Sequence, residues 1–98
     1  MLDYPEISKI VETSAKRILG KENVVRVFTE PGTDSEGKDA MRITIVITPE
    51  AVTRIKGDAL LDNLLEIHNR LSEAGEDRTP MVGYATEEEL AEIDDPES

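Results

Sequence analysis

Few residues of this chain could do chemistry. His68 is the only histidine, and cysteine is absent. A histidine acts as a general base when a carboxylate orients it, but His68 stands among the leucines of a predicted helix. This placement predicts a structural, half-buried histidine. Because zinc needs several nitrogen or sulfur ligands, we expect no metal site.

An acidic segment at residues 34–39 superficially suggests a calcium loop. An EF-hand needs glycine at its sixth position and glutamate at its twelfth. Counted from Asp34, Gly37 is fourth and Ile45 is twelfth. The segment therefore predicts a solvated hairpin tip. Glycine-rich phosphate loops and Gly-x-Ser-x-Gly elbows are also absent, so we expect no cofactor and assign no catalytic residue.

The most individual string of the sequence is Glu-Asp-Arg-Thr-Pro, residues 76–80. Its arginine, Arg78, could bind an anion or a partner's carboxylate, or form a local ion pair that orders a connector. If the protein is a small enzyme or ligand-binding protein, we expect His68, Arg78 and Tyr84 to line a cleft.

The charge of the chain narrows the classes of partner. It has 22 acidic and 11 basic residues, a net charge of −11. The basic residues are scattered, whereas phosphate backbones need clustered lysine and arginine. We therefore expect no direct binding to nucleic acid or to an anionic membrane. A basic protein partner suits this charge, as does a role in solubility alone. Without a secretory signal at the N-terminus, we expect the protein in the cytoplasm.

Hydrophobic spacing predicts the elements that position these residues. Helices are expected at 5–19 and 59–74, the second capped by Asp58, and a short helical turn at 49–55 with Thr48 as a possible cap. The expected strands are 23–29, 41–48 and 81–85, with a long, mobile hairpin loop at 30–39. A Thr86–Glu89 capping box opens a last helix at 87–93. Residues 94–98 are predicted to be a flexible acidic tail.

The helix predicted at 59–74 carries a stripe of leucines. Leucines at positions 61, 64, 65 and 71 share one face with His68. Since a helix of a small domain buries its apolar stripe, we expect this face to pack on the core.

The order α-β-β-α-β-α predicts a two-layer α+β fold in one domain, residues 1–93. An antiparallel hairpin and a short third strand would form the sheet, with the helices packed on one face. Whether the third strand lies beside the first or the second is left open by the sequence.

Alternation in the second predicted strand separates two faces of the sheet. Met41, Ile43, Ile45 and Ile47 would face the helices, whereas Arg42, Thr44, Val46 and Thr48 would face away. Arg26 and Phe28 join the second set if Val25 and Val27 point inward. Arginine and aromatic residues are frequent in interfaces. The partly apolar open face formed by these six outward residues is therefore our predicted partner-binding surface.

The Glu-Asp-Arg-Thr-Pro string, after a hairpin and an amphipathic helix, resembles small bacterial proteins of helix–hairpin–helix–strand layout with an acidic-Arg-x-Pro signature. The resemblance covers residues from about 20 to 90, and it implies no activity and no catalytic residue. The leading hypothesis is thus a non-enzymatic interaction module. It would form a homodimer, or hold a basic protein as an accessory or antitoxin-like partner.

Overall fold

The computed structural model describes residues 2–94. Its elements are α1 (Tyr4–Leu19), β1 (Val24–Thr33), β2 (Asp39–Ile47), α2 (Ala51–Arg54), α3 (Gly57–Glu73), β3 (Thr79–Ala85) and α4 (Glu87–Asp94). The predicted α+β class and the order α-β-β-α-β-α are confirmed, α2 being the predicted short turn. Of the predicted tail, residues 95–98 lie outside the described residues.

The sheet has the strand order β1-β2-β3. β1 and β2 are antiparallel, whereas β2 and β3 are parallel. The third strand therefore lies beside the second, which answers the question that the sequence left open. Because two parallel strands need a long crossover, the segment of α2 and α3 runs between β2 and β3.

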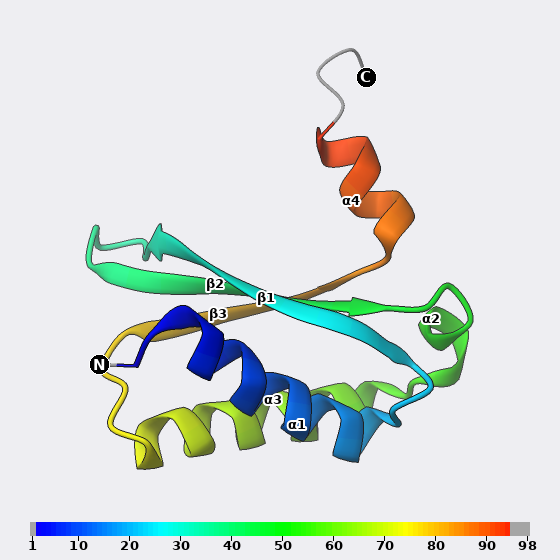
Figure 1. Ribbon diagram of the computed structural model, residues 1–98, viewed down its shortest axis with the longest axis horizontal. Coiled ribbons are helices and arrows are strands. Elements are labelled where there is room, and N and C mark those ends of the chain that lie inside the picture. Colours follow the sequence, from blue (N-terminus) through cyan, green and yellow to red (C-terminus); the bar gives the residue numbers. More distant parts are fainter. Residues whose placement is uncertain (1, 95–98) are drawn as a thin grey trace.

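The helices do not all lie on one side of the sheet (Figure 1). α1 and α3 lie side by side beneath one face, as predicted. α4 projects on the opposite side and stands away from the other helices. The expectation that every helix packs on one face is therefore wrong for α4.

The core lies between the sheet and the pair α1 and α3. The predicted inward residues of β2 are all buried, and they pack with one face of α1 and with two residues of α3: Met41, Ile43, Ile45, Ile47, Ile7, Val11, Ala15, Ile67 and Leu71. The predicted alternation of β2 is thus confirmed for its inward residues.

α3 buries a different face from the one predicted. Asn63, Ile67 and Leu71 are buried, whereas Leu61 and Leu65 are each 57% exposed and His68 is exposed. The buried face is centred on Ile67 and includes the hydrogen-bonded Asn63. Of the predicted stripe, Leu71 is buried and Leu64 is partly buried, as expected. The prediction is wrong for Leu61 and Leu65, and the prediction of a half-buried histidine is wrong.

The hairpin tip is shorter than predicted. β1 continues to Thr33 and β2 begins at Asp39, so residues 34–38 alone form the turn. Asp34 Oδ1 accepts hydrogen bonds from the backbone N–H groups of Glu36 and Lys38, each at 2.9 Å. Gly37 has a φ of 80°, a conformation that glycine adopts without steric cost. The ten-residue loop is therefore wrong, because both strands extend into it.

Two of the predicted helix caps are confirmed and one is wrong. Thr48 Oγ1 accepts a hydrogen bond from the N–H of Ala51 at 3.1 Å. Thr86 and Glu89 form the predicted reciprocal capping box. Asp58, however, lies inside the first turn of α3, which starts after Lys56 without a side-chain cap.

Candidate interaction surface

The sheet face turned away from α1 and α3 is here called the open face. Since Ile43 and Ile45 are buried toward the helices, the alternate residues of β2 and their cross-strand partners project the other way. The strand registers give four rows across the sheet: Arg26–Val46–Ala85, Phe28–Thr44–Gly83, Glu30–Arg42–Met81 and Gly32–Ala40–Thr79.

A β-bulge in β1 sets which valines point inward. The register shifts between Val24, which pairs with Ile47, and Arg26, which pairs with Val46. Val24 is buried in the core, and the extra residue, Val25, is 45% exposed. The condition that Val25 points inward is therefore wrong, because a bulge residue is unpaired and does not follow the alternation of side chains along the strand. Val27 packs against the core, as expected.

An ion pair closes one end of the open face. Arg26 Nη2 lies 2.9 Å from Glu87 Oε1. The pair joins β1 to the start of α4, which follows β3, so it crosses β2. Val46 lies in this row and is 0% exposed. Val46 therefore points away from the core as predicted, but it is covered and offers a partner no surface.

The methionine of β3 covers the other end of the open face. A Cβ atom placed on Gly32 would come within 3.1 Å of the Met81 Cε atom. The Met81 side chain therefore reaches from β3 across β2 to β1. Ala40, in the same row as Gly32, is only 2% exposed.

The part of the open face between these two covers is here called the central strip, formed by Phe28, Thr44, Gly83 and Arg42. Phe28 and Thr44 are partly exposed, and Gly83 has open space above its Cα. The guanidinium of Arg26 lies 5.0 Å from the Phe28 ring centroid, in reach of a cation–π contact. Arg42 is exposed and has no ion pair within residues 2–94.

The sixth predicted surface residue, Thr48, does not belong to this face. β2 ends at Ile47, and the Thr48 hydroxyl is used in the cap of α2. Of the six predicted residues, the structure thus brings Arg26, Phe28, Arg42 and Thr44 together on accessible surface. Sequence reasoning missed Met81 and Gly83, because their place depends on which strand β3 joins.

Comparisons with protein-family models, with curated proteins and with solved structures find no match for this chain.

The three residues of the alternative ligand site lie apart. Tyr84 and Arg78 are separated by six residues of extended chain, about 20 Å at the rise of a strand. Tyr84 lines a small pocket with α2 residues, of about 210 Å³, which neither His68 nor Arg78 reaches. His68 lies on the exposed side of α3. The predicted cleft is therefore not formed by these side chains.

Arg78 is occupied by the local ion pair that the sequence allowed. Its Nε lies 2.8 Å from Glu76 Oε2, and its Nη2 donates to Glu76 Oε1 at 3.0 Å and to the carbonyl of Leu2 at 2.7 Å. Glu76 Oε1 also accepts from the N–H of Leu2. The Arg78 hydrogen bonds lower the pKa of Glu76 to about 2 although burial opposes this. The pair thus binds Leu2 to the connector before β3, and Glu76, Arg78 and Leu2 together are called the clamp.

Tyr84 belongs to a polar network under α3. Its hydroxyl accepts from Asn63 Nδ2 at 2.9 Å and lies 3.4 Å from the carbonyl of Leu60. Asn63 Oδ1 and Glu66 Oε2 both lie within hydrogen-bond distance of the Ser14 hydroxyl. Burial raises the pKa of Tyr84, although the hydrogen bond from Asn63 opposes the shift. The network joins α1, α3 and β3, and its groups bond one another.

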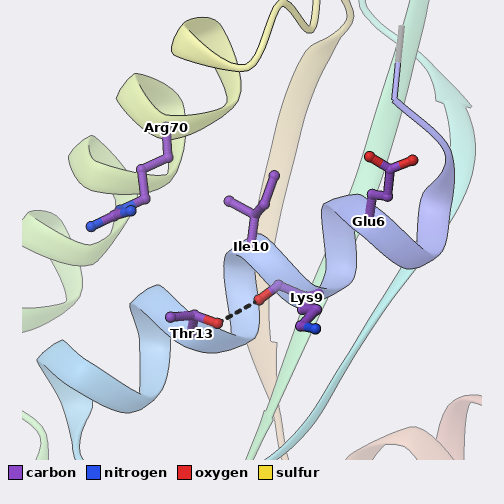
Figure 2. A pocket seen from close by; sticks show the side chains of 5 residues that line it. All are labelled: Glu6, Lys9, Ile10, Thr13 and Arg70. Atoms are coloured by element: carbon purple, nitrogen blue, oxygen red, sulfur yellow. Dashed lines mark hydrogen bonds between the residues drawn. The ribbon is translucent and has the colours of Figure 1, made fainter.

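A surface groove lies between α1 and α3 (Figure 2). It has a volume of about 390 Å³ and is lined by Glu6, Lys9, Ile10, Thr13 and Arg70. The Thr13 hydroxyl donates to the carbonyl of Lys9 at 2.9 Å, and the Arg70 Nε donates to Glu66. These polar groups are engaged within the chain, and none of them is buried.

The described part of the chain contains no cluster of metal-ligating side chains and no candidate membrane span. No group of three or more histidine or acidic side chains within it is arranged to hold a metal ion. None of its helices combines the length and the apolar character needed to cross a membrane.

Proposed function

We propose that this protein is a non-enzymatic interaction module that holds a partner protein against the open face of its sheet. The observation that carries the proposal is the central strip. There an aromatic ring, an arginine without an ion pair in the described chain and open space above Gly83 lie together between two covered ends. Interfaces concentrate their binding energy in aromatic and arginine residues of this kind.

The shape of the strip supports binding of a projecting side chain. Across the row from Phe28 through Thr44 to Gly83 the side chains become smaller, and Gly83 has none. The space above Gly83 is open. An apolar side chain of a partner would fill this space against the Phe28 ring. The Arg26–Glu87 pair holds Arg26 in place beside the ring, so little side-chain entropy is lost on binding.

The charge of the strip selects the chemistry of the partner. Arg42 has no ion pair in the described chain, and its cross-strand neighbour on the same face, Glu30, is also exposed. A carboxylate accepts two parallel hydrogen bonds from a guanidinium. At this surface a partner carboxylate is therefore favoured at Arg42, and Glu30 beside it remains open to a basic group of the partner.

The test is capture of partners from extract of the native cell by the tagged protein. We expect the wild type to retain one stoichiometric protein. Arg42→Glu removes the cation and Phe28→Asp removes the ring, so each variant should retain it at least tenfold less. Because both residues are partly or fully exposed, both variants should fold, which circular dichroism checks.

Two control variants match these changes in chemistry. Lys21→Glu makes the same change of charge in the exposed turn before β1, and Val52→Asp places an acid at an apolar residue of α2 that is 58% exposed. Both should capture the partner as the wild type does. Equal capture by Arg42→Glu, Phe28→Asp and the controls would refute a role of the central strip.

A further inference from the structure

Within residues 2–94, β3 is an edge strand whose outer side pairs with no other strand. It pairs with β2 alone, so half of the backbone N–H and C=O groups of Thr79–Ala85 point away from the sheet. Every residue of β3 is partly or fully exposed. The strand is thus open along its whole length.

The two edges of the sheet differ in how they are protected. β1 carries the bulge at Val25, the charged residues Arg26 and Glu30, and Pro31 in its interior. Bulges, charges and prolines are the devices that stop an edge from pairing with another chain. β3 has no bulge and no charged residue, and its one proline, Pro80, stands next to its start. In a chain with 34% charged residues, seven consecutive uncharged positions at an edge favour pairing.

An exposed apolar stripe of α3 lies beside this edge. α1 contacts α3 through Glu66, which binds Ser14 and Arg17. Residues two or five positions from Glu66 lie about 140–160° around the helix from it. Leu61, Leu64, His68 and Leu71 occupy these positions. Leu71 is turned toward the core and buried, whereas the other three lie on the flank of α3 turned away from α1. Leu65, one turn after Leu61, borders this flank and is 57% exposed.

The strands that α1 and α3 cover determine where this flank of α3 lies relative to the sheet. Ser8 of α1 is hydrogen-bonded to Thr29 of β1 at 2.8 Å, whereas Asn63 of α3 is bonded to Tyr84 of β3. α1 therefore covers the β1 side of the sheet and α3 covers the β3 side. The flank of α3 with Leu61, Leu64 and His68 consequently lies above the outer edge of β3.

We propose that β3 pairs antiparallel with β3 of a second copy, so that two sheets join into one and the two α3 helices pack through Leu61, Leu64, Leu65 and His68. A strand edge complements itself about a two-fold axis. With the axis at Val82, all seven residues of Thr79–Ala85 find a partner. This axis, perpendicular to the sheet, puts both helical layers on the same side. It brings the exposed leucines of one α3 against those of the other.

A second copy supplies what this surface needs, an uncharged strand edge with an apolar helix flank on the same side of the sheet. Two chains of net charge −11 repel each other over most of their surface. The edge of β3 is uncharged, so the strands meet without like charges facing one another. The surface uses the strand edge and the α3 side of the molecule, and it shares only Gly83 with the central strip. Self-association thus goes beyond the proposed partner binding and leaves Phe28, Thr44 and Arg42 of each copy free.

The test measures how the molar mass of the protein in solution depends on its concentration, by analytical ultracentrifugation or light scattering. We expect the mass to rise from 10.9 kDa to twice that value at high micromolar concentration. The double variant Leu61→Glu/Leu65→Glu should stay at the monomer mass. Both leucines are 57% exposed in the single chain, so the variant should fold. Val52→Glu, equally exposed on α2, is the matched control and should dimerise.

Hydrogen exchange tests the strand pairing itself. Amides of Thr79–Ala85 that face outward should become protected as the wild type dimerises, and they should stay unprotected in the double variant. A wild type that stays monomeric overturns the proposal, even if the edge then binds a peptide of another protein. A dimer that survives the double variant, or that forms without protection of β3, overturns it as well. Arg42→Glu separates the two proposals, because it should abolish partner capture and leave the dimer intact.

Discussion

Glu76 is the one ionisable residue that the structure buries among those it describes. Its carboxylate is held by Arg78 and by the N–H of Leu2, and the Arg78 guanidinium lies 5.2 Å from the Tyr4 ring centroid. A buried pair with all its hydrogen bonds made gives little net stability, but removing one member leaves the other uncompensated. The clamp therefore makes the attachment of the chain start to β3 dependent on the charge of one carboxyl.

We expect Glu76→Gln to lower the free energy of unfolding at pH 7 by about 3 kcal/mol, the value of a pKa lowered from 4.5 to about 2. Because the folded-state pKa is below the unfolded one, this stability is complete above pH 4.5. It is lost as the pH falls toward 2. The difference between wild type and variant should therefore shrink over that range, as measured by urea unfolding at several pH values.

Glu12→Gln is the control for this prediction. Glu12 pairs with Lys16 at 3.5 Å on the exposed side of α1, and exposed pairs contribute little. It should unfold at the same urea concentration as the wild type at each pH. A difference between wild type and Glu76→Gln that stays constant from pH 7 to pH 2 would contradict a stabilising charge on Glu76.

Residue types alone could not predict the polar network of the core. Ser14 interrupts the apolar stripe of α1, and Asn63 stands among the leucines of α3. Each is satisfied only by partners far along the chain, 49 residues apart for Ser14 and Asn63. A helical wheel counts Asn63 as solvent-facing and Leu61 as buried. In the structure Asn63 is buried with its hydrogen-bond partners, whereas Leu61 is exposed.

At the scale of elements, α4 depends on its cap. Figure 1 shows it projecting from the end of β3. Its first turn is held by the Thr86–Glu89 box and by the ion pair of Glu87 with Arg26, which lowers the pKa of Glu87. An isolated helix of this length is unstable in water, so local bonds decide whether it forms.

We expect Thr86→Ala to destabilise α4 by about 1 kcal/mol, the usual cost of losing an N-cap. Since α4 packs on little else, the loss should appear as fraying of residues 87–92 rather than as global unfolding. NMR chemical shifts of these residues would move toward random-coil values, while the urea midpoint of the sheet stays in place. Thr86→Ser keeps the hydroxyl and should retain the helix. Unchanged shifts in Thr86→Ala would contradict the dependence on the cap.

The elements themselves could be predicted better than their arrangement. Helical spacing, strand alternation and the Thr86 box are local signals, and the elements they predicted are present. The bulge at Val25 and the pairing of β3 with β2 depend on contacts between strands, which a single sequence does not encode locally. The open face was therefore predicted on β1 and β2 but not at Met81 and Gly83.

At the scale of the whole molecule, the net charge of −11 is concentrated in a body with a radius of gyration of 13.6 Å. Screening acts over about 10 Å at 0.1 M salt, which is less than this radius of gyration. The exposed ion pairs, such as Lys16 with Glu12, lose little when screened. Repulsion among the excess carboxylates should therefore dominate the response of stability to salt.

We accordingly expect the melting temperature to rise as sodium chloride increases from about 10 mM to 0.5 M, the range over which the screening length falls below the size of the molecule. Each kcal/mol of relieved repulsion corresponds to about 4–8 °C for a domain of this size. Calorimetry at low protein concentration keeps self-association out of the measurement. The double variant Glu22→Lys/Asp77→Lys changes two exposed acids and reduces the net charge from −11 to −7, so its melting temperature should depend less on salt. A melting temperature that falls with sodium chloride would mean that attractive pairs outweigh repulsion, because screening weakens whichever of the two is larger.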